Sequence, residues 1–372
     1  MPRFRSLHST SRSRPAILVA AGPSASPRRA TLDELASLLG GLDFIVEEVI
    51  RQRRPPDSST WIGSGKLEEL TAAVERVQAW TGTDPLVVLS DEVEPGRLRA
   101  LEASLGVSVI DRTELILRVF EARADTPLAQ LEIERARLVH ALPRLREQVG
   151  PTDREGGGGR GGRGHSNVVL AKRATMKRIA ELDERIAALR RGIDERVAGR
   201  ADVPRVALVG YTNAGKSSWM EALAGHSAGV RDALFHTLGT RVRALAHNPG
   251  PRILVADTVG FLEGLPHSLL DAFHSTLREA LAADLWVHVA DASSPHLDEQ
   301  IETTRRVLAE VSMQHVPSLL LLNKIDRVDD ARRSELGRRH PGAQLVSSGD
   351  REDVHEVGAF LRAFVEDELG ER

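Results

Sequence analysis

The sequence contains no cysteine and few aromatic side chains. Without cysteine the chain cannot form a disulfide, a thiolate nucleophile or a cysteine metal cluster, and this composition is compatible with a reducing cytoplasm. Only 3% of the 372 residues are aromatic. Alanine, leucine and valine must therefore supply the core, which is typical of a globular α/β protein rather than a β-sandwich.

Long apolar runs and a strong charge of one sign are also missing. No apolar run approaches the roughly 20 residues of a membrane span, and the run at residues 16–21 is too short for the core of a signal peptide. The formal net charge of −3 gives no overall attraction to nucleic acid, so any RNA contact would have to be local. We expect a cytoplasmic protein with no transmembrane segment and no DNA partner.

A glycine-rich stretch, Gly210-Tyr211-Thr212-Asn213-Ala214-Gly215-Lys216-Ser217, follows a short apolar run. That run, residues 204–209, has the length and branching of a buried parallel strand, and helix formers continue from the stretch until Gly225. Backbone N–H groups in such a loop surround a phosphate, and the positive end of the helix faces it as well. Lys216 adds a point charge and Ser217 offers a hydroxyl to Mg²⁺, so the stretch predicts a phosphate-binding loop.

A second strand-end motif, Asp257-Thr258-Val259-Gly260, comes directly after the apolar run at residues 252–256. An aspartate at the carboxyl end of such a strand holds Mg²⁺, usually through water, and the N–H of the following glycine can sense the γ-phosphate. Between the two motifs, Thr237 in Phe235-His236-Thr237-Leu238-Gly239 is the best candidate for a switch residue over Mg²⁺, and Thr240 is the alternative.

The base is predicted from Asn323-Lys324-Ile325-Asp326, which follows the apolar run at residues 318–322. The Asp326 carboxylate can accept from N1–H and the 2-amino group of guanine, whereas adenine lacks these donors, and such pairing rejects the wrong partner by about 10⁴ or more. A last strand at residues 343–346 precedes Ser347-Ser348-Gly349, whose backbone N–H groups could meet the guanine oxygen. The predicted ligands are therefore GTP and GDP.

Two positions bear on hydrolysis. Many GTPases place glutamine directly after the glycine of the second motif to orient the attacking water, but Phe261 follows Gly260 here. A phenylalanine side chain has no hydrogen-bonding group with which to orient that water, so we expect slow GTP hydrolysis without an activator. Asn213 could help to hold a monovalent cation such as K⁺ against the phosphates, or could only brace the loop, and the sequence leaves both interpretations open.

The predicted roles are divided among three sets of residues. Catalysis is assigned to Lys216, Thr237 and Gly260, and the metal to Ser217, Thr237 and Asp257. All residues of the motifs above, those with a catalytic or metal role included, are predicted to contact the nucleotide.

The rest of the chain is predicted to form three further parts. Residues 1–15 read as a disordered basic arm or, less simply, an organelle transit peptide, and residues 16–112 have the rhythm of a small α/β subdomain. Residues 113–200 predict a helical hairpin whose tip is the glycine-rich segment 155–164. Residues 201–372 then form the GTP-binding domain with a carboxyl-terminal helix. The fold class is α/β, with a mostly parallel sheet in the P-loop domain and helices on both of its faces.

A second phosphate loop at Gly63-Ser-Gly-Lys66 is excluded by spacing. Thr60 stands where the first glycine should be and Leu67 where serine or threonine should be, so a plain glycine turn into a helix is expected.

Positive charge gathers near the hairpin tip. Residues 160–178 contain six basic residues and no acidic one. This pattern fits a contact with RNA phosphates, for which Arg160, Arg163, Lys172 and Arg173 are the candidates, and it fits a solvated helix face equally well.

The sequence resembles the HflX family of ribosome-associated GTPases at Gly210-Tyr-Thr-Asn-Ala-Gly-Lys-Ser217, Asp257-Thr-Val-Gly-Phe261 and Leu265-Pro-His267. The first half resembles the same family at Trp61-Ile-Gly-Ser-Gly-Lys-Leu-Glu-Glu69, Asp91-Glu-Val-Glu-Pro-Gly96, Ile110-Asp-Arg-Thr-Glu-Leu-Ile-Leu117 and Pro143-Arg-Leu145. The member would be a divergent one. Gly164-His-Ser-Asn-Val-Val-Leu-Ala171 stands where the family carries Gly-Pro-Gly-Glu-Thr-Gln-Leu-Glu, and His236 and Gly239 stand where it has alanine and aspartate.

The resemblance implies an α/β amino-terminal subdomain, a helical hairpin and a G domain. It also implies GTP hydrolysis tied to binding of the large (50S) ribosomal subunit and its rRNA, in translation, ribosome biogenesis or the splitting and recycling of ribosomes. The alternative is a GTP-dependent switch for a protein partner in which hydrolysis is incidental. An ATP-driven RNA remodeller is a third possibility, and Asp326 argues against it.

Overall fold

The computed structural model of the chain describes residues 13–22, 32–146, 161–198, 203–225, 241–246, 252–258, 260–261, 282–311 and 316–369. The chain forms two compact units, residues 1–119 and 120–372. Among the described residues, no helix is both long and apolar enough to cross a membrane.

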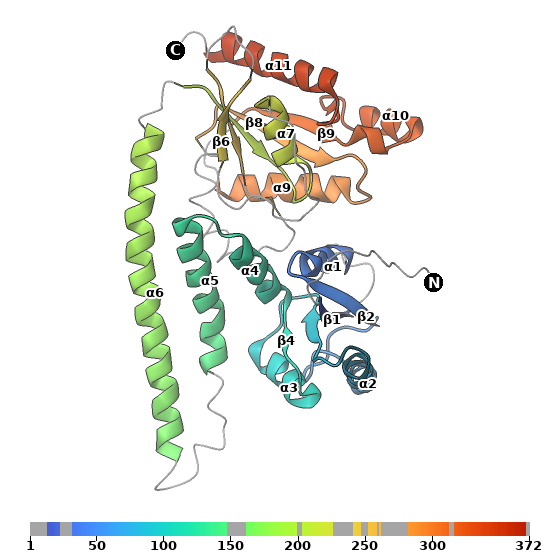
Figure 1. Cartoon of the computed structure of the whole chain (residues 1–372), viewed down its shortest axis with the longest axis vertical. Coiled ribbons are helices and arrows are strands. Elements are labelled where there is room, and N and C mark those ends of the chain that lie inside the picture. The colour runs from blue at the N-terminus through green and yellow to red at the C-terminus, as the bar shows by residue number, and fades with distance from the viewer. Residues whose placement is uncertain are drawn as a thin grey trace. The chain divides into compact units, whose positions relative to one another are not determined.

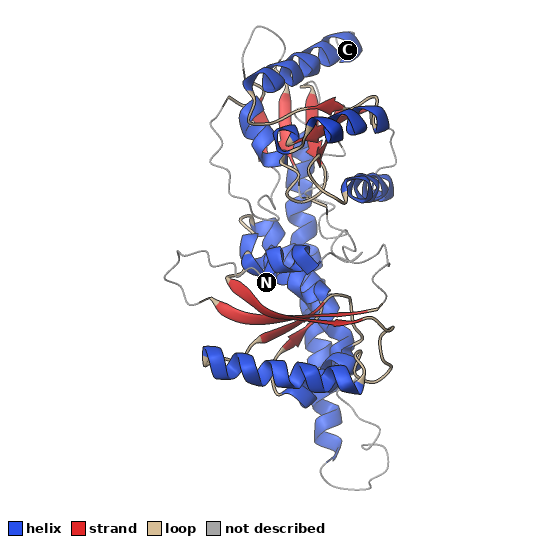
Figure 2. Cartoon of the chain, turned by 90° about the vertical axis from the view of Figure 1, so that its right-hand side faces the viewer, coloured by secondary structure: helices blue, strands red, loops and turns tan. Residues whose placement is uncertain are grey.

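The first unit is a small α/β structure built on four parallel strands in the order β2-β1-β3-β4 (Figures 1 and 2). Its elements are β1 (Arg14–Ala21), α1 (Leu32–Gly40), β2 (Phe44–Gln52), α2 (Ser64–Thr81), β3 (Leu86–Leu89), α3 (Pro95–Leu105), β4 (Val109–Ile110) and α4 (Arg112–Arg123), the last of which continues into the second unit. Strands and helices alternate from β1 to β4, which is the α/β rhythm that the sequence predicts for this part of the chain.

The core of this unit follows from the alternation of side chains along the strands. Ile17 and Val19 of β1 pack with Leu70 of α2 and Leu101 of α3, and all four side chains are fully buried. Gly63 forms the expected turn into α2, because it is the residue that precedes the helix and its N–H donates to Gln52 Oε1 at 2.8 Å, while residues 64–66 are the first turn of α2. The Gly-Ser-Gly-Lys segment thus serves as a helix entry.

After the end of α4, the second unit contains two antiparallel helices, α5 (Pro127–Arg146) and α6 (Gly161–Ala198) (Figure 1). Leu128, Leu182 and Ile186 form the buried seam of this hairpin. The start of α6 corrects the predicted tip, because residues 161–164 are helical. Each glycine costs a helix only about 1 kcal/mol relative to alanine, and extending an existing helix adds one hydrogen bond per residue. Arg163, Lys172 and Arg173 therefore all lie within α6.

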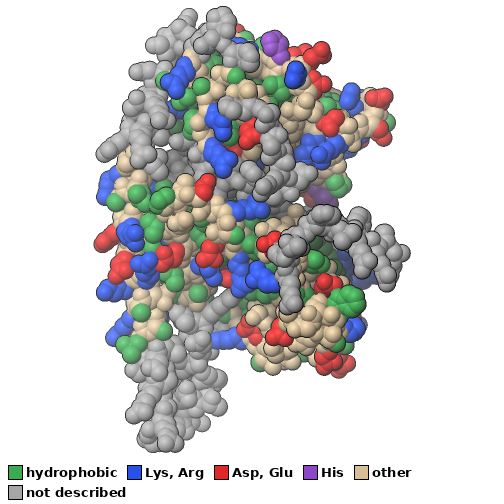
Figure 3. Space-filling model, viewed as in Figure 1, with side chains coloured by type: hydrophobic (Ala, Val, Ile, Leu, Met, Phe, Trp, Pro, Cys, Tyr) green, Lys and Arg blue, Asp and Glu red, His purple; other side chains and the backbone are tan. Residues whose placement is uncertain are grey.

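Ion pairs cross the hairpin at several levels. Arg178 forms a two-pronged pair with Glu134 of α5, at 2.8 and 3.1 Å, and Arg190 pairs with the buried Glu132 at 3.0 Å. Figure 3 shows basic and acidic side chains interspersed along this part of the molecule. Arg178, one of the six basic residues of the predicted patch, is thus engaged with carboxylates of the hairpin itself.

The described residues of the rest of the second unit contain an open sheet of six strands in the order β10-β9-β8-β5-β7-β6, and among these β6 alone runs antiparallel to its neighbour. Its strands are β5 (Arg205–Val209), β6 (Arg241–Ala244), β7 (Leu254–Asp257), β8 (Leu285–Asp291), β9 (Ser318–Asn323) and β10 (Gln344–Leu345). Its described helices are α7 (Lys216–Leu223), α9 (Leu297–Val311), η2 (Ile325–Arg327), α10 (Asp330–Arg339) and α11 (Arg351–Leu369).

The strand order places the three predicted motifs at one edge of this sheet. Val206 and Leu208 of β5 face a core that also contains Trp219 of α7 and Leu361 of α11. Strands β5, β7 and β9 are parallel members of the sheet, so the segments that follow them all leave at its carboxyl edge. The candidate site is located there.

Candidate nucleotide-binding site

The loop between β5 and α7 adopts a conformation that two glycines make accessible. Gly210 has φ 149°, and a Cβ there would lie 2.1 Å from the Val289 carbonyl oxygen. Gly215 has φ 102°, and a Cβ there would lie 2.1 Å from Asn323 Nδ2. No other residue fits either position without displacing the neighbouring strand or side chain. The loop is therefore held close to both β8 and β9.

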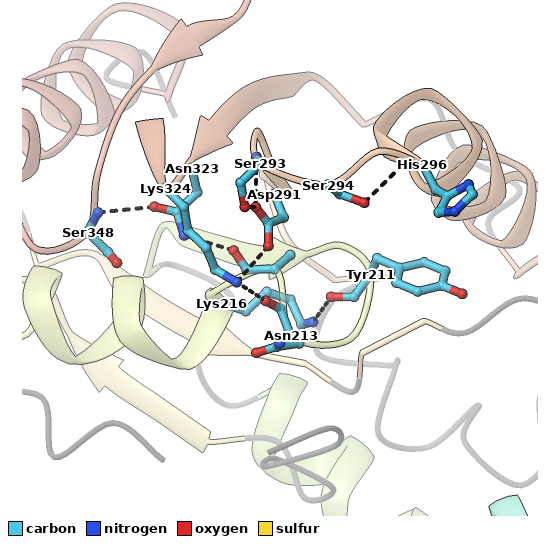
Figure 4. Close-up of polar contacts among 11 residues, drawn as sticks. Tyr211, Asn213, Lys216, Asp291, Ser293, Ser294, His296, Asn323, Lys324 and Ser348 are labelled. Atoms are coloured by element: carbon cyan, nitrogen blue, oxygen red, sulfur yellow. Dashed lines mark hydrogen bonds and ion pairs between the residues drawn. The ribbon is translucent and has the colours of Figure 1, made fainter. Parts of the chain in front are cut away.

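Lys216 begins α7 and points back into its own loop. Its Nζ donates to the Gly210 carbonyl oxygen at 3.0 Å and to the Tyr211 carbonyl oxygen at 2.9 Å (Figure 4). Burial lowers the pKa of Lys216 to about 8, and the negative charge of Asp257 opposes that shift. A buried ammonium beside a loop of backbone N–H groups is a strong attraction for a polyphosphate.

Ser217 and Asp257 meet beside this lysine, as the two motifs predict. Ser217 Oγ lies 2.7 Å from Asp257 Oδ2, and Asp257 is 0% exposed. The next residue, Thr258, donates from Oγ1 to the Leu208 carbonyl oxygen at 2.7 Å, which ties the end of β7 to β5. A hydroxyl and a carboxylate thus lie together at the carboxyl ends of neighbouring strands.

Phe261 is part of the scaffold under the loop. Its N–H donates to the Gly210 carbonyl oxygen at 3.1 Å, and its own carbonyl oxygen accepts from Thr212 N–H at 2.8 Å. The phenyl ring is 2% exposed. The residue that stands in place of a water-orienting glutamine therefore packs into the interior and pairs its backbone with the phosphate loop.

Asn323 and Lys324 connect the end of β9 to the same loop (Figure 4). Asn323 Nδ2 donates to the Ala214 carbonyl oxygen at 2.8 Å, and Asn323 Oδ1 accepts from Ser348 N–H at 3.1 Å. Lys324 Nζ donates to the Asn213 carbonyl oxygen at 2.8 Å. Ile325 is buried and Asp326 is exposed, so the predicted base-binding carboxylate is accessible from solvent.

The segment Ser347-Ser348-Gly349 lies against Asn323, but two of its N–H groups are engaged internally. Ser347 N–H donates to Asp353 Oδ2 at 2.6 Å, and Ser348 N–H donates to Asn323 Oδ1. Gly349 N–H makes a longer bond of 3.4 Å to Ser347 Oγ. One of these N–H groups would therefore have to give up its present hydrogen bond in order to donate to a guanine oxygen.

Two residues of the site region were not predicted from the sequence. Asp291 ends β8 and pairs with Lys324 at 2.7 Å, and a carboxylate at the end of an apolar strand is the same signal that identified Asp257. His288 lies inside β8, opposite Val209 of β5, and is 5% exposed. Burial, with the positive charges of Arg305 and Lys216, lowers the pKa of His288 to about 3. A histidine inside an apolar run gives no comparable signal in the sequence.

Several predicted residues lie outside the described part of the chain. They are the switch segment Phe235, His236, Thr237, Leu238 and Gly239, the alternative Thr240, Val259 of the second motif and Arg160 of the hairpin tip.

Family models match three consecutive parts of the chain. They are described as GTP-binding GTPase N-terminal at residues 29–121, GTP-binding GTPase Middle Region at residues 123–200 and 50S ribosome-binding GTPase at residues 205–324. Among solved structures, a GTP-binding protein from the archaeon Sulfolobus solfataricus in complex with GDP is 21% identical with a TM-score of 0.50, over 94% of this chain and 99% of that one. A complex of SsGBP and GDP is 22% identical with a TM-score of 0.55, over the same shares. These structures share the fold.

Curated relatives with the name GTPase HflX match most of the chain. The protein from Gluconacetobacter diazotrophicus is 41% identical over 92% of this chain and 82% of its own length. Those from Caldanaerobacter subterraneus subsp. tengcongensis and Spirochaeta thermophila are 37% and 36% identical over 87% and 86% of this chain, and over 72% and 79% of their own lengths. These matches confirm the predicted resemblance, and the structure brings the glycine-rich loop, the buried Asp257 and Asn323 together at one edge of the sheet. The chain belongs to the HflX family of GTPases and is a GTPase.

Proposed function

We propose that this GTPase holds GTP with Mg²⁺ at the edge formed by β5, β7 and β9, and that its hydrolysis serves association with the large ribosomal subunit. The observation that carries the proposal is the meeting of phosphate-binding and base-binding segments at one loop. Lys216 and Ser217 lie on the phosphate side, and Asn323 lies against the same loop from the base side. A nucleotide could thus span the two.

The oxygen donors beside the loop fit Mg²⁺, which prefers hard oxygen ligands. Ser217 Oγ and the fully buried Asp257 carboxylate are 2.7 Å apart. Ser217, Asp257 and Thr237 of the switch segment are the residues that would hold the ion. An Mg²⁺ ion held there would neutralise charge that develops on the phosphate oxygens.

The site residues supply the remaining support for hydrolysis. Lys216 would face the β- and γ-phosphates, and Gly260 N–H would sense the γ-phosphate. The buried ring of Phe261 cannot orient water, so we propose that turnover is slow until a partner supplies that function.

A monovalent cation beside Asn213 is a further part of the proposal. Asn213 is exposed and has φ 61°, and its carbonyl oxygen is held by Lys324 Nζ. This leaves its side chain at the surface of the loop, where an amide oxygen could help to hold K⁺ against the phosphates. Turnover should then be faster in K⁺ than in Na⁺ at equal ionic strength. Equal rates in the two salts would reject the cation.

The ribosomal role is supported by the family model for residues 205–324, which is described as a 50S ribosome-binding GTPase. A role on the ribosome would also place the protein in the cytoplasm. Cosedimentation with large subunits tests the role, with a non-hydrolysable GTP analogue compared with GDP. We expect binding that favours the analogue. Equal absence of binding with both nucleotides would point instead to a switch for a protein partner.

The rRNA contact is proposed at the basic part of the hairpin, with Arg160, Arg163, Lys172 and Arg173 as candidates. Arg173 is exposed and Lys172 half-buried on α6. Phosphate contacts make binding fall steeply with salt, and each lost contact lowers the slope of log K against log salt by about 0.7–0.9. Replacing all four residues by alanine should therefore flatten the slope and leave GTP affinity unchanged.

A matched control exists on the same helix. Arg185 and Arg191 are exposed on α6, and Arg191 lies ~27 Å along the helix from Arg173 at 1.5 Å per residue. Arg185→Ala/Arg191→Ala should keep the parent's slope. If the quadruple variant also keeps it, the basic segment is a solvated face.

A further inference from the structure

Asp291 is a junction between three segments of the candidate site. One carboxylate oxygen, Oδ2, accepts from Lys324 Nζ at 2.7 Å. The other, Oδ1, accepts from Ser293 N–H at 2.9 Å and Ser293 Oγ at 2.6 Å (Figure 4). The side chains of Asp291 and Lys324 are 19% and 13% exposed, so the pair is largely shielded from water and salt. Both oxygens of the carboxylate are thus committed to fixed partners.

Lys324 extends this junction to the phosphate loop. Its Nζ lies between Asp291 Oδ2 and the Asn213 carbonyl oxygen, at 2.7 and 2.8 Å. The backbone supports the same arrangement, because Asp291 pairs with Asn323 in the β8–β9 register and Ala292 N–H donates to the Asn323 carbonyl oxygen at 2.8 Å. The lysine therefore joins the ends of two neighbouring strands to the phosphate loop.

Lys324 and Asn213, which are joined by the bond from Lys324 Nζ to the Asn213 carbonyl oxygen, both have unusual backbone conformations. Each has φ 61°, in the left-handed region that residues other than glycine rarely occupy. Such conformations persist only where the surroundings hold them. Because Lys324 immediately precedes η2, its conformation sets the direction in which the chain turns from β9 toward Asp326.

We propose that Asp291 is a positioning residue for guanine recognition. Its carboxylate fixes the Lys324 ammonium, and the fixed lysine holds the turn that presents Asp326 in register with the phosphate loop. This inference rests on the proposed role of residues 323–326 in binding the base. An ion pair that only stabilised the fold would change the unfolding midpoint and leave the choice of base unaffected.

The test compares GDP with IDP, whose hypoxanthine base lacks the 2-amino group that Asp326 is proposed to bind. In the full-length protein, Asp291→Asn keeps the shape of the side chain and removes its charge. We expect GDP to dissociate at least several-fold faster, and the ratio of IDP to GDP dissociation constants to fall several-fold toward one. Asp291→Glu, which restores the charge, should recover part of both changes.

Two controls separate this effect from general ones. Asp298→Asn removes the same charge from α9, where Asp298 pairs with Arg339 and His340 at the surface, and should leave both measurements at the parent's values. Ser293→Ala removes the hydroxyl contact to Oδ1 but keeps the backbone N–H contact and the pair with Lys324, and should have a smaller effect than Asp291→Asn. If Asp291→Asn does not fold, Lys324→Met removes the same pair from the other side.

The outcomes are distinguishable from those of the proposed function. A parent protein that binds GDP and IDP equally would contradict the assignment of Asp326 to guanine. A parent that prefers GDP, together with an Asp291→Asn variant of unchanged preference and dissociation rate, would overturn the positioning role alone. The same holds for an unchanged preference in Lys324→Met.

Discussion

The buried histidine of β8 should make the stability of the nucleotide-binding domain sensitive to mild acid. His288 is 5% exposed, and within the described part of the chain its Nε2 has no hydrogen-bond partner. Burial and the nearby positive charges of Arg305 and Lys216 lower its pKa from 6.5 to about 3. The native state therefore keeps this imidazole neutral at pH values where the unfolded chain protonates it.

The sign and size of the effect follow from proton linkage. Because the native pKa is the lower one, the unfolded state binds one more proton between the two values, and stability falls as the pH decreases below 6.5. The slope is ~1.4 kcal/mol per pH unit for one proton, so moving from pH 7.5 to pH 5 should cost about 2 kcal/mol through this group. For a domain of this size that corresponds to a decrease in Tm of roughly 4–8 °C.

Calorimetry of the full-length protein can measure this contribution. The transition that GDP shifts upward identifies the nucleotide-binding domain, and its Tm is compared at pH 7.5 and pH 5 in the parent and in His288→Phe. The packing cost of the new ring cancels in the pH difference, so the variant should lose about 2 kcal/mol less on acidification than the parent. His355→Gln, which alters an exposed histidine of α11, should behave like the parent. Equal pH differences for the parent and His288→Phe would refute the reasoning.

Three further predictions concern the site. Asp326→Asn should weaken GTP and favour xanthosine triphosphate, because an amide can donate to the 2-oxo group, and an unchanged preference in competition binding would contradict the assignment. Since burial lowers the pKa of Lys216 to about 8 and phosphates favour its charged form, nucleotide binding above pH 8 should take up a proton and weaken by up to about tenfold per pH unit. Titration calorimetry in buffers of different ionisation enthalpy measures that uptake. If nucleotide binding at pH 9 takes up no proton, the prediction is wrong. Gly215→Ala should abolish most nucleotide affinity, because its Cβ would lie 2.1 Å from Asn323 Nδ2. Gly337→Ala, with no atom within 4 Å of the new Cβ, should bind like the parent and gain up to about 1 kcal/mol of stability.

The sequence by itself determined the features that depend on neighbouring residues. The loop at residues 210–217 was predictable because its glycines, lysine and serine are contiguous and its backbone geometry requires glycine at two positions. Asp257 and Asn323 were predictable because parallel strands leave at one edge of a sheet, so a polar residue after an apolar run has few other places to lie. The boundaries of α3, residues 95–105, follow from the proline that begins it and the glycine that ends it.

The tertiary structure alone decided the features that depend on partners far along the chain. Strand β6 consists of Arg241, Val242, Arg243 and Ala244, is not buried, and becomes a strand through its antiparallel pairing with β7. In the sequence Arg178 belongs to a basic segment, but the fold places it beside Glu134 of α5, which is 44 residues away in the sequence. Likewise, the pairing of Asp291 with Lys324 depends on the β8–β9 register. Local propensity and burial patterns specify each element, but the partner of a charge is set by which elements the fold brings together, and that information is distributed over the whole chain.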